Sequence, residues 1–247
     1  MTPQIMMSER LMKPLRLLEY IHSLEDNQFD LVYPRGVRNL SPVHWTPVTV
    51  ARRAAAFLVR EPNTRVLDIG CGPGKFCIVG ALTTGGQFTG VEQRKDLCDL
   101  AQTTIHQANI PNAKVFSGNI AEVDFSGFDA FYLFNPFEEN LETELRIDDS
   151  VHFSINLYSR YTQHVAEQLA MAPLGTRVAT YCGVYQEVPM GYECLENSMD
   201  SRLKFWEKTK HERMVAKPPE APVTGSKGRF MSRSFDTDER GDWDGAD

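Results

Sequence analysis

The sequence predicts an α/β fold in which a doubly wound, mostly parallel sheet carries helices on both faces, and three observations favour it. From Arg65 onward, short apolar runs alternate with segments whose apolar residues recur at helical spacing. Strands separated by helices imply right-handed crossovers and therefore a parallel sheet. A glycine-rich turn joins the first strand of this series to its first helix. Two strand-like runs, YECLENS and RLKFWEK, come close together within residues 192–208 and indicate an antiparallel hairpin at one edge.

The first 62 residues are expected to be a helical segment with a long loop. Apolar side chains at helical spacing predict an amphipathic helix that ends near Leu24. These side chains are Leu11, Leu15, Leu18 and Ile21. Residues 26–47 are rich in Pro, Gly and Asn, which is typical of a loop. A further helix is predicted to begin at Pro47, with Thr46 as its cap, and to end before Pro62.

The remaining elements follow from the same alternation. Strands are expected at residues 65–69, 87–91, 113–117, 128–134 and 177–182. Helices are expected at residues 74–83, 94–109 and 155–171. The chain is thus predicted to consist of an N-terminal helical segment with a covering loop (1–62), an α/β domain (63–209) and a tail (210–247). The tail has few aliphatic residues and mixed charge, so we expect it to be disordered.

Composition and charge narrow the classes of partner. The chain has 247 residues, of which 42% are hydrophobic and 24% charged, as is usual for a globular protein with a sizeable core. No apolar run reaches the length of a membrane helix, so a cytoplasmic protein without a membrane partner is expected. The formal net charge of -7 would repel a polyanion, which places nucleic acid low among the partners. The sequence does not indicate an oligomeric state.

The cysteines do not predict a metal site or a disulfide framework. Five are present, an odd number, and no two are spaced as CxxC. Cys71 lies within the glycine-rich turn, where a small buried side chain is a simpler interpretation than a nucleophile.

The stretch VLDIGCGPGKF, residues 66–76, points to a nucleotide-like ligand. A glycine-rich turn between a strand and a helix lets the backbone approach a ligand and directs amides of the helix N-terminus towards it. The glycines Gly70, Gly72 and Gly74 are spaced GxGxG. Lys75 stands where the dinucleotide fingerprint has its third glycine, so a nicotinamide dinucleotide is disfavoured.

Two carboxylates refine the identity of this ligand. Asp68 lies at the end of the first predicted strand, where it would repel a pyrophosphate but can face an ammonium group. Glu92 ends the second strand, a place from which a carboxylate accepts hydrogen bonds from both hydroxyls of a ribose. Together they describe an adenosine with an amino-acid tail.

Over residues 45–207 the chain resembles the class I S-adenosylmethionine-dependent methyltransferases, through VLDIGCGPGKF, FTGVEQ and FSGNI. The resemblance implies a seven-stranded sheet with an antiparallel C-terminal hairpin, and S-adenosylmethionine as the cofactor. It also implies that the three glycines accommodate the methionine part, that Asp68 supports its ammonium and that Glu92 holds the ribose. Asn119 stands where the family usually has an acid on the adenine amine, and Ile120 would lie against the adenine ring. The predicted cofactor site is completed by Cys71, Gln93 and Asn135.

The stretch FYLFNPFEEN ends the fourth strand, where this family lines the place at which the methyl group leaves sulfur. Asn135, Pro136 and Phe137 are therefore predicted to be catalytic. The stretch has one proline fewer than amide-nitrogen and adenine methyltransferases carry. It is also similar to the corresponding stretch of the non-SET histone lysine methyltransferases of the disruptor-of-silencing type. A plain loop after a buried strand remains an open alternative.

The segment SPVHWTP lies where the family commonly folds over the cofactor. His44, Trp45 and Tyr33 are predicted to bind the substrate, with Arg35 beside them. In the alternative interpretation, Trp45 belongs to the core and His44 to a surface turn.

The predicted function is methyl transfer from S-adenosylmethionine to an acceptor, with a protein side chain or a small molecule favoured over nucleic acid. Two alternatives remain open. One is a module of the same fold that binds the cofactor without catalysis. The other is an NAD-dependent oxidoreductase, which Lys75 and Asp68 disfavour.

Overall fold

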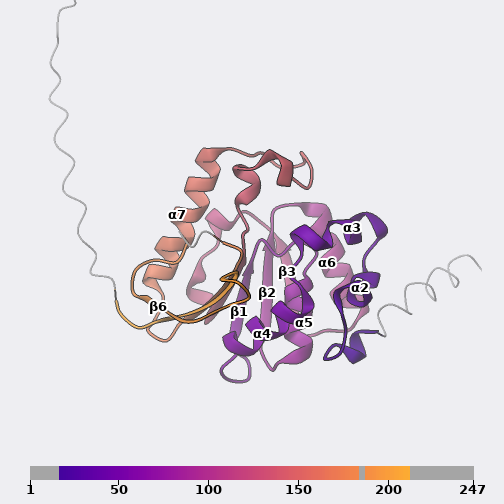
Figure 1. Ribbon diagram of the computed structural model, residues 1–247, viewed down its shortest axis with the longest axis horizontal. Helices are drawn as coiled ribbons and strands as arrows, with labels where there is room; N and C mark the ends of the chain where they lie inside the picture. Colours follow the sequence, from indigo (N-terminus) through magenta and orange to yellow (C-terminus); the bar gives the residue numbers. More distant parts are fainter. Residues whose placement is uncertain (1–16, 184–186, 212–247) are drawn as a thin grey trace, which may run out of the picture. The chain divides into compact units, whose positions relative to one another are not determined.

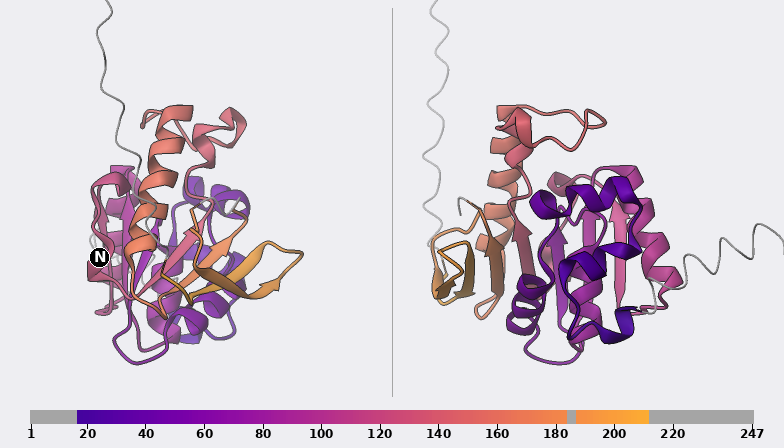
Figure 2. Two further views of the ribbon diagram at one scale, coloured as in Figure 1. Left: turned by 90° about the vertical axis from the view of Figure 1, so that its left-hand side faces the viewer. Right: turned by 45° about the vertical axis from the view of Figure 1, so that its right-hand side comes forward.

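The computed structural model describes residues 17–183 and 187–211. Within them, seven strands form one sheet in the order β3-β2-β1-β4-β5-β7-β6 (Figure 1). Helices lie on both sides of the strands, and the hairpin of β6 and β7 forms one edge of the sheet (Figure 2). This arrangement confirms the predicted doubly wound, mostly parallel sheet with an antiparallel C-terminal hairpin. No helix in the described part of the chain has the length and apolarity needed to cross a membrane.

The strands begin and end close to where the sequence predicts them. They are β1 (Arg65–Ile69), β2 (Gln87–Glu92), β3 (Ala113–Ser117), β4 (Ala130–Phe134), β5 (Arg177–Tyr181), β6 (Tyr192–Ser198) and β7 (Leu203–Lys208). The central strand β1 pairs in parallel with β2 on one side and β4 on the other. β7 pairs antiparallel with both β5 and β6. The carboxyl ends of β1, β2 and β4 therefore meet at one edge of the sheet.

The apolar side chains of each central strand alternate between two cores. In β1, Val66 packs into one core cluster, whereas Leu67 and Ile69 pack into the other. The same alternation separates Tyr132 from Phe131 in β4. Because both faces of these strands are buried, they are apolar at nearly every position.

Four longer helices cover the two faces. They are α4 (Val48–Leu58), α5 (Lys75–Thr83), α6 (Lys95–Gln107) and α7 (Ile155–Met171). Most buried apolar residues of α4, α5 and α6 belong to one core cluster, and those of α7 belong to the other. Figure 1 shows α7 on one side of the strands and α4, α5 and α6 on the other side. Short 3-10 helices lie in the connections: η3 (Ile120–Glu122), η4 (Phe125–Gly127), η5 (Glu138–Asn140) and η6 (Thr143–Leu145).

The N-terminal region differs from its prediction. The helix expected to end near Leu24 is instead the short η1 (Leu17–Tyr20) followed by a turn, and residues 11–16 lie outside the described residues. Residues 26–47, expected to be a loop, contain α2 (Asp26–Phe29), η2 (Asp30–Val32) and the ten-residue α3 (Arg35–His44). Both predictions are wrong because burial overrides local composition. Leu18, Ile21 and Leu24 all pack into the core although no long helix joins them.

The cap predicted at Thr46 is also wrong. The Thr46 hydroxyl is buried and lies 3.0 Å from the Tyr132 hydroxyl. The first amide of α4, on Val48, donates instead to a carboxylate oxygen of Asp26 at 2.9 Å. A side chain far away in the sequence therefore caps this helix, which no local signal reveals. The tail predicted to be disordered lies outside the described residues, except for residues 210 and 211.

Candidate functional site

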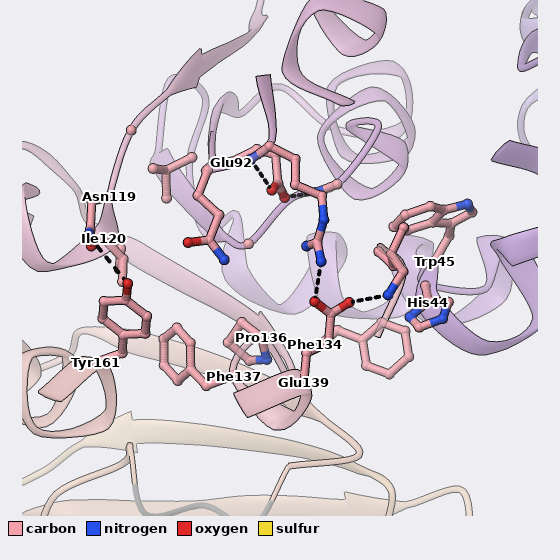
Figure 3. A pocket seen from close by; sticks show the side chains of 17 residues that line it. His44, Trp45, Glu92, Asn119, Ile120, Phe134, Pro136, Phe137, Glu139 and Tyr161 are labelled. Carbon is pink, nitrogen blue, oxygen red and sulfur yellow. Dashed lines mark hydrogen bonds and ion pairs between the residues drawn. The ribbon is translucent and has the colours of Figure 1, made fainter. Parts of the chain in front are cut away.

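An open pocket of about 650 Å³ lies at the carboxyl ends of β1, β2 and β4. Figure 3 shows its side chains: Asn119, Ile120 and Tyr161 stand on one side, His44 and Trp45 on the other, and Glu92 between them. In open α/β sheets, ligands bind at the carboxyl edge of the strands. They bind between two neighbouring strands whose connections run in opposite directions.

The glycine turn after β1 forms part of the floor of this pocket. Gly70 and Gly72 line it, with φ angles of +73° and +54°. A Cβ on Gly70 would lie 2.8 Å from Pro136, and one on Gly72 would lie 2.6 Å from the Trp45 ring. No side chain fits at either position without displacing a neighbour. Gly74 differs, because it begins α5 at a φ of +79°, faces Ala101 and does not line the pocket.

Glu92 is the acidic group at the centre of the pocket. Its side chain is 5% exposed, and burial raises the pKa of its carboxyl although two amides partly offset this effect. The amides of Gly72 and Arg94 donate to its two oxygens, at 2.9 Å and 2.8 Å. A carboxylate offers about four acceptor positions, so two remain for a ligand. The neighbouring Gln93 also lines the pocket.

Asp68 lies behind the glycine turn, not in the main pocket. It lines a smaller cavity of about 250 Å³, whose walls also include His44, Trp45 and Phe134. Asp68 is 3% exposed, and burial raises the pKa of its carboxyl to about 8, with the charge of Glu92 adding to the shift. Within the described residues its side chain has one hydrogen-bond partner, the Cys77 thiol at 3.5 Å, and no cation. A buried carboxyl without a cation suits the ammonium group expected there.

Cys71 also lines the smaller cavity. Its sulfur lies 2.5 Å from where a Cβ on Gly90 would be, so it fills space against β2. Burial holds the pKa of the Cys71 thiol well above its usual range, which disfavours a nucleophile.

Asn119 and Ile120 line the main pocket, as the cofactor assignment requires. The Asn119 side-chain oxygen Oδ1 accepts from the amide of Ala121 at 3.0 Å and so caps the start of η3. Its amide nitrogen lies 3.4 Å from the Tyr161 hydroxyl (Figure 3). The Asn119 side chain therefore both caps η3 and lines the pocket.

The loop after β4 places only part of the predicted catalytic stretch at the pocket. Phe134, Pro136 and Phe137 line it, and the Phe137 ring packs 5.5 Å from that of Tyr161. Asn135 lines neither the main pocket nor the smaller cavity. Its backbone has a φ of +43°, a conformation that Asn tolerates better than most residues. Asn135 thus forms the turn whose two neighbours, Phe134 and Pro136, line the pocket.

The N-terminal region supplies His44 and Trp45, which end α3 and wall the pocket. Trp45 is 6% exposed, and its indole nitrogen donates to the Val37 carbonyl at 2.9 Å. Tyr33, which is predicted to bind the substrate with them, lies against the glycine turn. Its buried hydroxyl donates to the Pro73 carbonyl at 3.1 Å, so it supports the glycine turn and lines neither cavity. Arg35 lines a different hollow, beside α2 and α3.

Lys75 attaches this covering region to the glycine turn. Its side chain is 2% exposed, and its ammonium donates to Asp26 at 2.6 Å, Asp30 at 2.8 Å and Ser41 at 3.2 Å. The residue that replaces the third dinucleotide glycine is therefore a buried cation that holds α2, η2 and α3 in place.

Sequence reasoning missed Arg94 and Tyr161 as pocket residues. Arg94 binds Glu139 at 2.5 Å and Asp148 at 3.1 Å, and so fixes the segment after β4 over the pocket. The closeness of Arg94 to Glu92 was a usable signal, because Glu92 ends β2 and Arg94 comes two residues later. Tyr161 gave no signal, since it is one of two tyrosines on α7 that pack into the core.

The comparisons with known proteins agree with this geometry. The family described as "Methyltransferase domain" matches residues 60–204, more than half of the chain. The chain belongs to this family, the S-adenosylmethionine-dependent methyltransferases of class I. S-adenosylmethionine is the cofactor that this membership assigns to it. No curated protein matches.

Two solved structures share the fold. One is an RNA methyltransferase from Salinibacter ruber in complex with S-adenosyl-L-homocysteine, which is 18% identical with a TM-score of 0.50. The match covers 68% of the present chain and 96% of the Salinibacter chain. TrmN from Thermus thermophilus is 16% identical with a TM-score of 0.50, covering 70% of this chain. This chain spans 52% of TrmN and 43% of the [4+2]-cyclase SpnF, which is 16% identical with a TM-score of 0.41. At such identities the likeness concerns the fold.

Proposed function

We propose that this methyltransferase transfers the methyl group of S-adenosylmethionine to a protein side chain or a small molecule. The observation that carries the proposal is the position of Glu92, which is buried at the centre of the pocket with acceptor positions to spare. When bound, the cofactor supplies a sulfonium methyl group. Glu92 would hold its ribose, and Asn119 and Ile120 would flank its adenine.

The smaller cavity would receive the amino-acid end of the cofactor. It adjoins the main pocket, because His44, Trp45, Gly70 and Phe134 line both. Asp68 supplies a buried carboxyl there. The two spaces thus offer a carboxylate at each end, Glu92 for a nucleoside and Asp68 for an ammonium group.

A nicotinamide dinucleotide fits the chain less well. Its pyrophosphate would approach the start of α5, where Lys75 is already bound to Asp26 and Asp30. Asp68 would repel the phosphates in its charged form.

The choice of acceptor rests on charge. Arg94 lines the pocket, but Glu139 and Asp148 neutralise its guanidinium. The whole chain carries a formal charge of -7. A polyanionic acceptor would therefore meet little attraction at the pocket.

Two measurements test the proposal. Calorimetry should show binding of S-adenosylhomocysteine and none of NAD. Incubating a cell extract with methyl-labelled S-adenosylmethionine should then place the label in protein or small molecules. Label confined to RNA would contradict the choice of acceptor, and binding without any labelled acceptor would identify a non-catalytic module.

A further inference from the structure

We propose that His44 is the catalytic base of this site, and that the methyl acceptor is accordingly a hydroxyl, which must lose a proton when it is methylated. The inference rests on the proposed function, because it assigns a role at the same pocket. It moves the polar catalytic group from the loop after β4 to the end of α3.

The position of His44 carries the proposal. It lines both the main pocket and the smaller cavity, together with Trp45, Gly70 and Phe134. If the nucleoside lies by Glu92 and the ammonium by Asp68, the sulfur between them lies where the two spaces adjoin. His44 stands at this junction, on the side opposite Asn119 and Tyr161 (Figure 3).

The imidazole is able to accept a proton. His44 lines both spaces, no hydrogen bond to its ring nitrogens is found within residues 17–183 and 187–211, and the ring lies 5.8 Å from that of Trp45. By contrast, a ring nitrogen of His164 lies 3.0 Å from the Val123 carbonyl. His44 therefore has both an accessible nitrogen and a fixed neighbour, whereas Asn135 lines neither space.

The groups facing His44 keep it neutral at physiological pH. Partial burial lowers the pKa of His44, the charge of Arg94 lowers it further, and Glu139 opposes both. Asp68, Cys71 and Lys75 share the smaller cavity with it. Asp68 has a pKa of about 8 and Cys71 one well above its usual range, so neither contributes charge below pH 7. Lys75 is paired with Asp26 and Asp30.

The proton balance of the step defines the class of acceptor. The lone pair of the acceptor forms the new bond to the methyl carbon, and the electron pair of the broken carbon–sulfur bond stays on sulfur. The acceptor's proton passes to a ring nitrogen of His44 and later to water. A thioether, a thiolate or a neutral amine would need no such base in the transfer step, whereas a hydroxyl requires one.

The first test needs no acceptor. S-adenosylmethionine and S-adenosylhomocysteine differ by one methyl group and one positive charge at sulfur, so protonated His44 should weaken binding of the first selectively. We expect calorimetry between pH 5 and pH 8 to show that the dissociation constant of S-adenosylmethionine, divided by that of S-adenosylhomocysteine, falls about tenfold as pH rises. His44→Asn should make the ratio independent of pH. His106→Asn, an exposed histidine on α6, is the matched control and should behave as wild type.

The outcomes separate this inference from the proposed function. If both ligands bind with a ratio that does not change with pH, His44 does not face the sulfur and the inference is wrong. If neither ligand binds the wild-type protein, the proposed function fails and the inference fails with it.

A second measurement tests the role as a base. With the acceptor labelled in the extract, His44→Asn should bind both ligands normally at pH 8 but transfer the methyl group roughly a hundredfold more slowly. The wild-type rate should fall below the pKa of His44, and the variant should lose this limb of its pH profile. A variant that transfers at the wild-type rate would show that His44 only lines the pocket.

Discussion

The two walls of the main pocket are built in different ways. One, which we call the nucleoside wall, consists of Glu92, Gln93 and residues 118–120. Glu92 ends β2, Gln93 follows it directly and residues 118–120 follow β3, and two backbone amides hold the carboxylate of Glu92. This wall is fixed by the sheet itself.

The other, which we call the covering wall, consists of His44 and Trp45 at the end of α3. It precedes the sheet in the chain and is fixed by side chains. The Trp45 indole is bound to Val37, and the Lys75 ammonium anchors α2 and η2 behind it. The nucleoside wall should therefore withstand any change that leaves the sheet folded, whereas the covering wall should depend on a few buried contacts.

Lys75→Met should separate the two walls most strongly. It leaves Asp30 buried without its cation, and removing one partner of a buried ion pair costs about 3 kcal/mol or more. We expect the melting temperature to fall by roughly 6–12 °C. Lys95→Met, which removes an exposed lysine on α6, should scarcely change it. Equal melting temperatures for the two variants would show that the Lys75 cluster does not hold the cover.

Gly72→Ala tests the place where the two walls touch. The new Cβ would clash with the Trp45 ring at 2.6 Å, in a left-handed conformation that itself costs about 1–2 kcal/mol. We expect the free energy of unfolding to fall by about 2–3 kcal/mol and binding of S-adenosylhomocysteine to weaken. Denaturant unfolding and calorimetry measure both quantities. Gly127→Ala, where a Cβ meets nothing within 4 Å, is the control, and a similar result for both variants would contradict the close contact.

Glu92→Ala tests the nucleoside wall alone. It removes the acceptor proposed for the ribose hydroxyls, at about 1.5–3 kcal/mol for each charged hydrogen bond, so the dissociation constant should rise at least tenfold. Glu92→Gln keeps one acceptor oxygen and the shape of the side chain. Its dissociation constant should lie between those of Glu92→Ala and the wild type. A folded Glu92→Ala protein with unchanged affinity by calorimetry would remove Glu92 from the site.

Asp68→Asn distinguishes the ligand-free state from the bound state. The pKa of Asp68 is raised to about 8 in the folded protein, against roughly 4 unfolded. Its contribution to stability is therefore present below about pH 4 and is lost as pH rises towards about 8. We expect the melting temperature of the variant to rise relative to that of the wild type as pH rises across this window, and the variant to bind cofactor more weakly. A difference that does not change with pH would show that Asp68 is not a buried, neutral carboxyl.

Asn135→Ala should have the smallest effect. The backbone of Asn135 has a φ of +43°, which Ala adopts less readily than Asn, so Asn135→Ala should lower the free energy of unfolding by about 1 kcal/mol. Asn135→Gly should leave it nearly unchanged. We expect both variants to keep cofactor affinity and single-turnover methyl transfer. If both variants transfer the methyl group at least tenfold more slowly, the carboxamide acts in the reaction after all.

The sequence by itself determined the sheet, the glycine turn and the nucleoside wall. These features are local, because a strand of alternating or continuous apolar residues ends at a defined place and the next few residues must lie at the edge of the sheet. Asp68, Gly70 and Glu92 could thus be placed from their spacing alone. The same logic placed Asn135 at the correct edge, but it could not tell that this side chain lines neither space.

Only the tertiary structure decided how residues 26–47 fold and what they cover. Their Pro, Gly and Asn content predicts a loop, yet α3 forms there because Ser41 and Trp45 are buried and Lys75, far along the chain, binds the adjoining segments. Burial and ion pairing between distant residues outweigh local propensities of a few tenths of a kcal/mol per residue. For that reason the position of His44 at the junction of the two spaces could be found only from the folded chain.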